Sequence, residues 1–344
     1  MNLTLSNGAD TVRVALETGH ICDLTLNGIT PLHRAPWIDA PEVQRDTSIP
    51  LVERGLQGDF FCAPFGKSDL IDGPIHGMTA NSPWEVIAQT DSLAVLRLRV
   101  DVMGAQIEKT VALEGGALFQ THRIVGGAGG LTVAHHPMVR MAQGADLSYS
   151  AKALAVTPDH PLEPGRNWLR YPAQTTDVKR FPGRDGLVDL TRYPDQPGHE
   201  DFVTLIEADG AALGWTAISR HAEKDLIVIV KDPRVLPVTM LWFSNGGRDY
   251  APWNGRHRGV LGIEDGCAAG AAGHRAAVEQ GLAARFGVPT CLRLGDTHVI
   301  EHAIYTVPLA QSVRVTDMTV QDQTLVATCA VGPDITLGQA PNWL

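Results

Sequence analysis

The sequence predicts an all-β protein, a β-sandwich or a β-barrel, with one or two short helices. Short runs rich in β-branched and aromatic residues follow one another along the chain, separated by Gly, Pro, Asn and Asp. Only residues 271–286 have the composition of a helix. A dozen or more strands with so little helix do not fit a fold of alternating strands and helices.

The expected strands run the length of the chain. Residues 11–16 and 21–26 predict a first hairpin, and Asn27-Gly28 is a strong turn pair that ends its second strand. Residues 93–102 alternate apolar and polar side chains, as a half-buried strand does. The other expected strands are 106–113, 117–125, 131–140, 201–208, 213–219, 225–231, 238–244, 291–308 with a break at Gly295-Asp296, 312–319 and 324–331.

Two long segments, 31–85 and 157–200, are rich in Pro, Gly and Asp and have no clear periodicity. Loops of this length inside a compact domain are usually functional or disordered. We therefore expect them to line one face of the sheets. No repeat, linker or shift in composition divides the chain, so residues 1–344 are expected to form a single domain.

Composition and charge argue against several classes of partner. The chain has 28 Lys and Arg against 38 Asp and Glu, a formal net charge of −10, and no basic block that would bind nucleic acid. No apolar run reaches the roughly 18 residues of a membrane helix, so no membrane is expected. Five scattered cysteines and the absence of a signal-peptide pattern favour a cytoplasmic protein. The acidic balance fits a neutral or cationic small molecule as the ligand, and we expect a monomer or a homodimer.

A first candidate for chemistry is the loop Asp72-Gly73-Pro74-Ile75-His76-Gly77. A histidine between Pro and Gly has little to pack against, and the glycine after it lets another group approach the backbone closely. The plainer alternative is a turn histidine that bonds to nearby carbonyls. Trp84 follows; it fits a core position, but an indole face beside a polar cleft is also a surface on which a sugar stacks.

A second candidate is His135-His136-Pro137 in the expected strand 131–140. Successive strand residues face opposite ways, so only one of the two imidazoles can point into a given cleft. The alternative is one exposed and one core histidine. An imidazole held on a strand is well suited to give and take a proton near neutral pH.

A third candidate is Gly262-Ile263-Glu264-Asp265-Gly266, which follows the apolar pair Val260-Leu261. The sequence predicts that both carboxylates lie at the open end of a buried strand. Asp-Gly is ordinary turn chemistry, so Asp265 is expected to cap or turn the chain. Glu264 has no such role and is disfavoured in strands, which makes it the candidate functional carboxylate.

His298-Val299-Ile300-Glu301-His302 matches a zinc-peptidase pattern that requires a helix. The residues around it favour a strand, on which the two histidines would lie about 13 Å apart. Zinc–nitrogen bonds are only about 2.0–2.1 Å long. We therefore expect no metal site here.

Several motifs together resemble the aldose 1-epimerases of the galactose-mutarotase-like superfamily. The likeness covers roughly residues 10 to 308 and implies a large antiparallel β-sandwich, a sugar cleft on one sheet, and no metal or nucleotide. The motifs, in the order of that family, are Pro64-Phe65-Gly66-Lys67, His76-Gly77 with Trp84, His136-Pro137, Gly262-Ile263-Glu264 and Leu292-Arg293-Leu294-Gly295-Asp296-Thr297.

The resemblance also implies roles. Glu264 would take the proton from the anomeric hydroxyl, His136 would protonate the ring oxygen, and His76 would orient the sugar, so the expected activity is interconversion of α and β anomers of a free or modified aldose. Lys67 replaces the family's Arg and lacks its bidentate reach, and His135-His136-Pro137-Met138-Val139 replaces the usual Asn-His-x-Tyr-Phe. The further residues expected to contact sugar are Lys67, Trp84, Trp242 and Asp59, with Asp185 or Asp189 as the sugar-binding Asp.

Two other functions fit the same sequence. A non-catalytic carbohydrate-binding or sensing protein could use the same scaffold, since fold does not fix function. A polysaccharide lyase or glycosidase is the third possibility, because related sandwiches occur in those enzymes.

Overall fold

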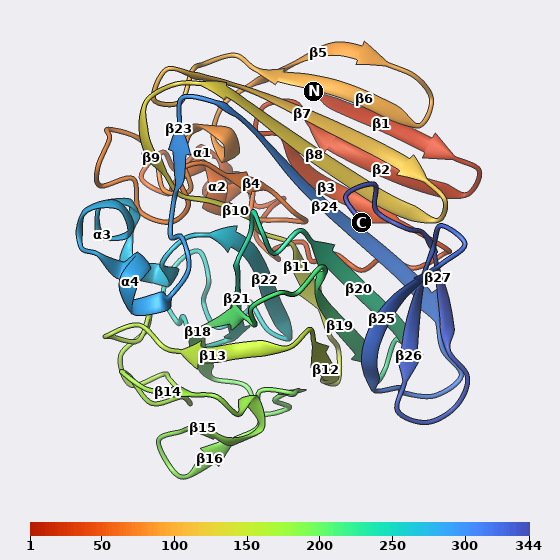
Figure 1. Ribbon diagram of the computed structural model, residues 1–344. Coiled ribbons are helices and arrows are strands. Elements are labelled where there is room, and N and C mark those ends of the chain that lie inside the picture. The colour runs from red at the N-terminus through yellow and green to blue at the C-terminus, as the bar shows by residue number, and fades with distance from the viewer.

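Two large antiparallel sheets form the body of the molecule in the computed structural model, which describes residues 1–344 (Figure 1). The chain forms 27 strands and four short α-helices, which confirms the predicted all-β class. None of the helices has the length and hydropathy needed to cross a membrane.

One large sheet, called the site sheet below, has eight strands. Seven follow one another in hydrogen-bonded order, and β11 (Met138–Arg140) also pairs with β22. The order is β14 (Gln174–Thr175), β13 (Lys152–Val156), β18 (His199–Glu207), β21 (Val238–Asn245), β22 (Val260–Cys267), β10 (Val133–His135) and β4 (Phe61–Cys62).

The other large sheet, called the back sheet, has nine strands. Its long central strand, coloured blue in Figure 1, crosses the whole molecule. The order is β17 (Arg192–Tyr193), β12 (Ala145–Tyr149), β19 (Gly214–Arg220), β20 (Asp225–Lys231), β24 (Thr297–Pro308), β8 (Ala117–Gly126), β7 (Ala105–Glu114), β6 (Leu93–Leu98) and β5 (Trp84–Gln89).

Smaller elements complete the fold. Three-stranded sheets form at both ends of the chain, from β1 (Asn2–Asn7), β2 (Asp10–Ala15) and β3 (His20–Thr25), and from β25 (Val315–Gln321), β26 (Thr324–Cys329) and β27 (Ile335–Gln339). Two pairs are β15 (Phe181–Pro182) with β16 (Leu187–Val188), and β23 (Leu292–Leu294) with β9 (Gly129–Leu131). The helices are α1 (Pro41–Arg45), α2 (Leu51–Arg54), α3 (His274–Glu279) and α4 (Leu282–Phe286), with 3₁₀ turns at Met78–Ala80, Val178–Arg180 and Gly270–Ala272.

Alternation along the strands separates the core from the face that carries the site. On β21, Leu241 and Phe243 join the main core of 46 buried residues between the sheets. Met240 and Trp242 point the other way, into a second cluster of 20 residues that the segment 31–85 covers. Each large apolar side chain buried in this way contributes about 1.5–3 kcal/mol. The expectation that 31–85 lines one face of a sheet is therefore confirmed.

The hairpin and turn predicted near the N-terminus are confirmed. β2 and β3 pair antiparallel. Asn27 and Gly28 have φ angles of 52° and 75°, the left-handed values that a two-residue hairpin turn requires. The strand preceding this hairpin, β1, was not predicted.

The predicted single helix over 271–286 is wrong. It is two helices, α3 and α4, because Gly281 between them has a φ of 65° in the left-handed region, where a helix cannot continue. The helices α1 and α2 lie in the segment 31–85, for which no helix was predicted.

The predicted strand 131–140 is broken rather than continuous. It divides into the end of β9, then β10 and β11, with the second break at His136-Pro137. Proline has no N–H to give to a ladder, and the N–H of His136 is donated to the Asp59 carboxylate instead. The break predicted at Gly295-Asp296 is present between β23 and β24.

Candidate active site

A cavity of about 210 Å³ lies on the face of the site sheet that points away from the back sheet. Trp242 and Glu264 rise from neighbouring strands, and Lys67 and His76 come from the covering segment 31–85. His136 enters from the break between β10 and β11. The structure thus brings together residues from four parts of the chain.

Strand register places His136 opposite Glu264. Ala134 pairs with Gly266 and Met138 pairs with Gly262, so residue 136 lies midway, across from residue 264. The Nε2 of His136 is 3.0 Å from Oε1 of Glu264, and both side chains are almost fully buried. Of the two neighbouring histidines, only His136 faces the cavity, because the side chain of His135 points into the core. This agrees with the prediction that only one of the two could point into a given cleft.

The carboxylate of Glu264 controls the charge of His136. Burial on its own lowers the pKa of the imidazole, but the adjacent Glu264 outweighs burial, and the pKa of His136 is raised above its ordinary value. The ring also stacks on Phe60, with centroids 4.5 Å apart. The pair can therefore hold one proton between a carboxylate and an imidazole and pass it in either direction.

His76 is held in a strained conformation beside this pair. Its φ angle is 63°, which costs a non-glycine residue energy and is typical of functional sites. Its Nδ1 lies 3.3 Å from the thiol of Cys62, and its ring meets that of His136 edge-on at 5.3 Å. Burial, and then the cationic form of His136, lower the pKa of His76, so it is neutral at pH 7.

Gly77 is required where it stands, as the sequence suggested. A Cβ at this position would lie 2.0 Å from the carbonyl oxygen of Ala63. The close approach fixes the loop that carries His76 against β4.

Trp242 and Lys67 also line the cavity. The indole N–H of Trp242 donates to Oε1 of Glu200 at 2.7 Å, which fixes the ring as one wall. Burial raises the pKa of Glu200 to about 7. The side chain of Lys67 is exposed at the rim and makes no ion pair.

Sequence reasoning missed Arg248, which lies in the loop between β21 and β22 and lines the cavity. Its guanidinium lies over the indole of Trp253 at 4.3 Å and over that of Trp242 at 5.4 Å. Its Nε is 3.3 Å from Glu163 and 3.4 Å from Glu200. The glycine-rich loop before β22, which contains Arg248 and Trp253, was the feature of the sequence that could have indicated this contribution to the cavity.

Two residues expected to contact sugar do not line the cavity. Trp84 is 2% exposed, belongs to the core between the sheets, and donates its indole N–H to the carbonyl of Thr79. Asp59 is fully buried behind His136, where it accepts the backbone N–H of that residue at 2.9 Å. Asp59 therefore positions His136 and does not reach a ligand.

The two alternatives for a sugar-binding Asp also lie elsewhere. Asp185 borders a separate surface hollow, and Asp189 accepts hydrogen bonds from Thr191. Their segment, 157–200, contributes Leu162 to the cavity.

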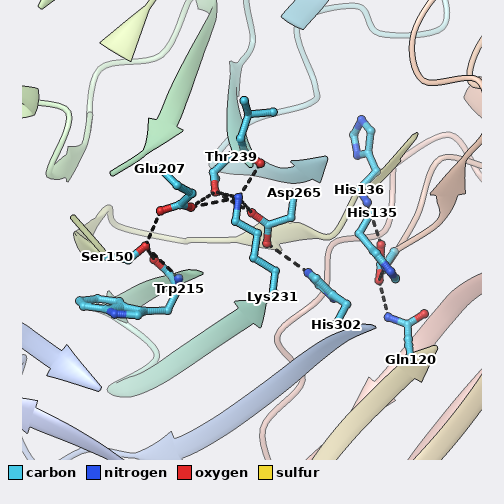
Figure 2. A network of polar contacts seen from close by, with 12 residues as sticks. Gln120, His135, His136, Ser150, Glu207, Trp215, Lys231, Thr239, Asp265 and His302 are labelled. Carbon is cyan, nitrogen blue, oxygen red and sulfur yellow. Dashed lines mark hydrogen bonds and ion pairs between the residues drawn. The ribbon is translucent and has the colours of Figure 1, made fainter. Parts of the chain in front are cut away.

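Asp265 is not a turn residue, because β22 continues to Cys267 and Asp265 lies inside the strand. It points away from the cavity into a buried ionic network (Figure 2). Lys231 lies between the carboxylates of Asp265 at 3.1 Å and Glu207 at 3.0 Å, and His302 contacts the other oxygen of Asp265 at 3.2 Å. This network ties β22 to the strands of both sheets.

One buried cluster has the residue types of a metal site. Ligand atoms of Asp59, His135 and His302 all lie within 4.8 Å of one another. The two imidazoles are stacked, however, with centroids 4.1 Å apart and planes 8° from parallel. A metal ion binds in the plane of each ring at about 2.0–2.1 Å, so stacked rings cannot share one. The cluster fits a hydrogen-bonded core. His298, the other histidine of the zinc-like pattern, is half-buried and bonds to the carbonyl of Arg293.

No protein-family profile matches the chain, and no curated protein matches it in sequence. Among solved structures, a galactose mutarotase related enzyme from Lactobacillus acidophilus superposes with a TM-score of 0.57 over 91% of this chain and 99% of that one, at 14% identity. The chain has the galactose mutarotase-like fold.

Two further structures with this fold have similar values. A galactose mutarotase-like protein from Lactobacillus casei gives a TM-score of 0.55 at 12% identity, covering 89% of this chain and 100% of the other. A galactose 1-epimerase from Lactobacillus acidophilus gives 0.52 at 13% identity, covering 90% and 94%. At these identities the likeness is one of fold.

Proposed function

We propose that this protein is an aldose 1-epimerase that interconverts the α and β anomers of an aldose. The observation that carries the proposal is the buried contact between Nε2 of His136 and Oε1 of Glu264 in a cavity walled by Trp242 and Arg248. Opening a sugar ring requires one proton removed and one delivered at neighbouring oxygens, and this pair supplies both groups. The galactose mutarotase-like fold supports the same conclusion.

In the proposed reaction, the Glu264 carboxylate takes the proton of the anomeric hydroxyl. The C1–oxygen double bond forms, the bond between C1 and the ring oxygen breaks, and the ring oxygen takes the proton of His136 Nε2. Rotation about C1–C2 turns the other face of the aldehyde to the released hydroxyl. Ring closure then returns one proton to His136 and the other to the anomeric oxygen, so that nothing is consumed.

The supporting residues fit these roles. The carboxylate of Asp59 accepts the backbone N–H of His136 and so holds this residue in place for repeated proton transfer by its imidazole. His76, kept neutral by burial, is available to hydrogen-bond a sugar hydroxyl. Lys67 and Arg248 supply further donors at the rim and wall. No step needs a group other than these side chains.

The test is anomer exchange measured by saturation-transfer NMR or polarimetry over a panel of aldoses. We expect the protein to accelerate exchange of at least one sugar, and Glu264→Gln and His136→Asn each to lower the rate by about 10²–10⁴-fold. Asp265→Asn, on the adjacent position but the opposite face, is expected to affect stability and not the chemistry. Binding without acceleration, with Glu264→Gln indistinguishable from the parent, would identify a carbohydrate-binding protein instead.

A further inference from the structure

A second cavity of about 520 Å³ adjoins the first and is called the outer cavity below. Leu162 and Ala271 line both cavities, so the two lie next to one another. The outer cavity is bounded by residues 156–162, which begin at the last residue of β13, and by the α3–α4 segment, which Figure 1 shows beside β13 and β18.

The site sheet forms a common floor under both cavities. Phe202 lines the first and Thr204 lines the outer one, and residues two apart on β18 share a face. Thr204 pairs with Met240, which pairs with Glu264. Since neighbouring strands lie about 4.8 Å apart, Thr204 is about 10 Å across the sheet from Glu264. That separation exceeds the width of one pyranose ring.

The outer cavity offers polar groups that have no partner within the protein. Thr204 is 2% exposed, yet its hydroxyl makes no hydrogen bond to the rest of the chain. The exposed side chains of Gln280 and His160 also line the cavity and make no hydrogen bond within the protein. A hydroxyl that lines a cavity and has no partner in the protein is open to a hydrogen bond from a ligand or from water.

The charges around the outer cavity balance. Arg285 lies 3.6 Å from Asp159, and Arg275 bonds to Glu279 and to the backbone of Asp69. Two arginines and two aspartates line the cavity, so it has no surplus for an anion. Phe286 adds one apolar surface. A neutral ligand with many hydroxyl groups matches this lining.

We propose that the outer cavity binds a second sugar residue, so that the substrate is a reducing di- or oligosaccharide whose terminal ring is opened in the first cavity. The inference rests on the proposed function for that first ring. It adds the substrate class: the second sugar, which is linked to the reacting ring, lies in the outer cavity and contacts Thr204, Gln280 and His160.

The experiment compares glucose and galactose with maltose, cellobiose, lactose and melibiose in the anomer-exchange assay, and measures binding of the same sugars by calorimetry. We expect kcat/KM for at least one disaccharide to exceed that of its reducing monosaccharide by about tenfold, the gain of one or two net hydrogen bonds. Contacts present in both ground and transition states act through KM, so the gain is expected in KM.

Two substitutions test the location. Ala272→Trp fills the outer cavity from an exposed position, and it is expected to bring the ratio of disaccharide to monosaccharide kcat/KM to about 1. Thr204→Val removes only the unpartnered hydroxyl and is expected to lower the same ratio severalfold. Ala88→Trp, on an exposed edge position of β5, is the matched control and leaves the ratio unchanged.

The outcomes separate the two proposals. Exchange of monosaccharides with no advantage for any disaccharide, or an advantage that survives Ala272→Trp, would overturn the second-sugar inference and leave the epimerase proposal standing. Absence of exchange for every sugar would overturn the epimerase proposal. In that case calorimetry decides the inference: disaccharide binding that Ala272→Trp abolishes supports it, and no preference for disaccharides overturns it.

Discussion

At the scale of single residues, His136 is notable because separate atoms serve separate purposes. Its backbone N–H is held by Asp59, and its Nε2 contacts Glu264. Sequence reasoning identified His136 and Glu264 because each is chemically unusual where it stands. It could not distinguish a residue that lines the cavity from one that supports it, so Asp59 and Trp84 were expected to contact sugar.

The raised pKa of His136 predicts how activity depends on pH. As the acid, His136 is active when protonated, so activity is present below its folded pKa and is lost as pH rises through it. The ordinary pKa of a histidine is about 6.5, and Glu264 raises the pKa of His136 above it. The falling limb of kcat/KM should therefore lie above pH 6.5. The profile is measured after subtracting spontaneous exchange.

An NMR titration of His136 provides the control for this assignment. In Glu264→Gln the carboxylate is gone, and the imidazole pKa should fall below its value in the parent protein. Activity that keeps rising from pH 6.5 to alkaline pH would contradict the assigned role.

Cys62 is expected to position His76. Cys62→Ala removes the thiol 3.3 Å from Nδ1 and frees the ring, so KM should rise severalfold while the pH profile set by His136 stays in place. Cys62→Ser restores a donor and should recover most of the loss. Cys329→Ala, in the C-terminal sheet, is the matched control. Equal effects of the Ala and Ser variants would show that only packing is involved.

At the scale of elements, β22 presents Glu264 to the cavity and Asp265 to the buried network. The alternation of a strand makes this division possible, but it could not be predicted from local sequence, because Asp-Gly also predicts a turn. The partners of Asp265 are Lys231, Thr239 and His302, from three other strands, and only tertiary structure brings them together.

Lys231 is expected to be essential for stability. It is fully buried and compensates both Glu207 and Asp265. Lys231→Ala leaves two buried carboxylates without their shared cation, which should cost about 3–5 kcal/mol of the free energy of unfolding. Urea unfolding measures the change, and Lys179→Ala on the surface is the control. A loss below about 1 kcal/mol would show that the network is dispensable.

At the scale of the whole molecule, the all-β class and most strands could be predicted from local sequence. The alternation of apolar and polar residues and the turn residues both depend only on positions that are close together in the chain. The division into two facing sheets was implied by the resemblance. The broken strand at His136-Pro137, the split helix at Gly281 and the contribution of Arg248 depend on contacts between distant segments. Those contacts leave little trace in a single sequence.

Buried titratable groups predict a loss of stability in mild acid. Burial lowers the pKa of His20, His33 and His135 to about 4. Between pH 6.5 and 4 the unfolded chain binds protons that the folded one does not, so each histidine makes stability fall by about 1.4 kcal/mol per pH unit as pH drops. Glu200, with a pKa raised to about 7, acts in the opposite sense between its unfolded value and 7.

Three histidines lower the stability as the pH falls, and only Glu200 opposes them. We therefore expect the urea concentration at the midpoint of unfolding to decrease from pH 6.5 to pH 5. A midpoint that is highest near pH 5 would contradict the burial of these histidines. Because the transitions must be compared at equilibrium, reversibility is checked at each pH.

The register that sets residue 136 across from residue 264 has a practical consequence for durability. No mobile lid has to close to assemble the acid and the base. Pairing of β22 with β10 and β11 brings residues 136 and 264 together whenever the site sheet is folded. Heat should therefore inactivate the protein and melt its sheets in a single event. A one-residue deletion on either backbone should abolish turnover outright, with no gradual decline.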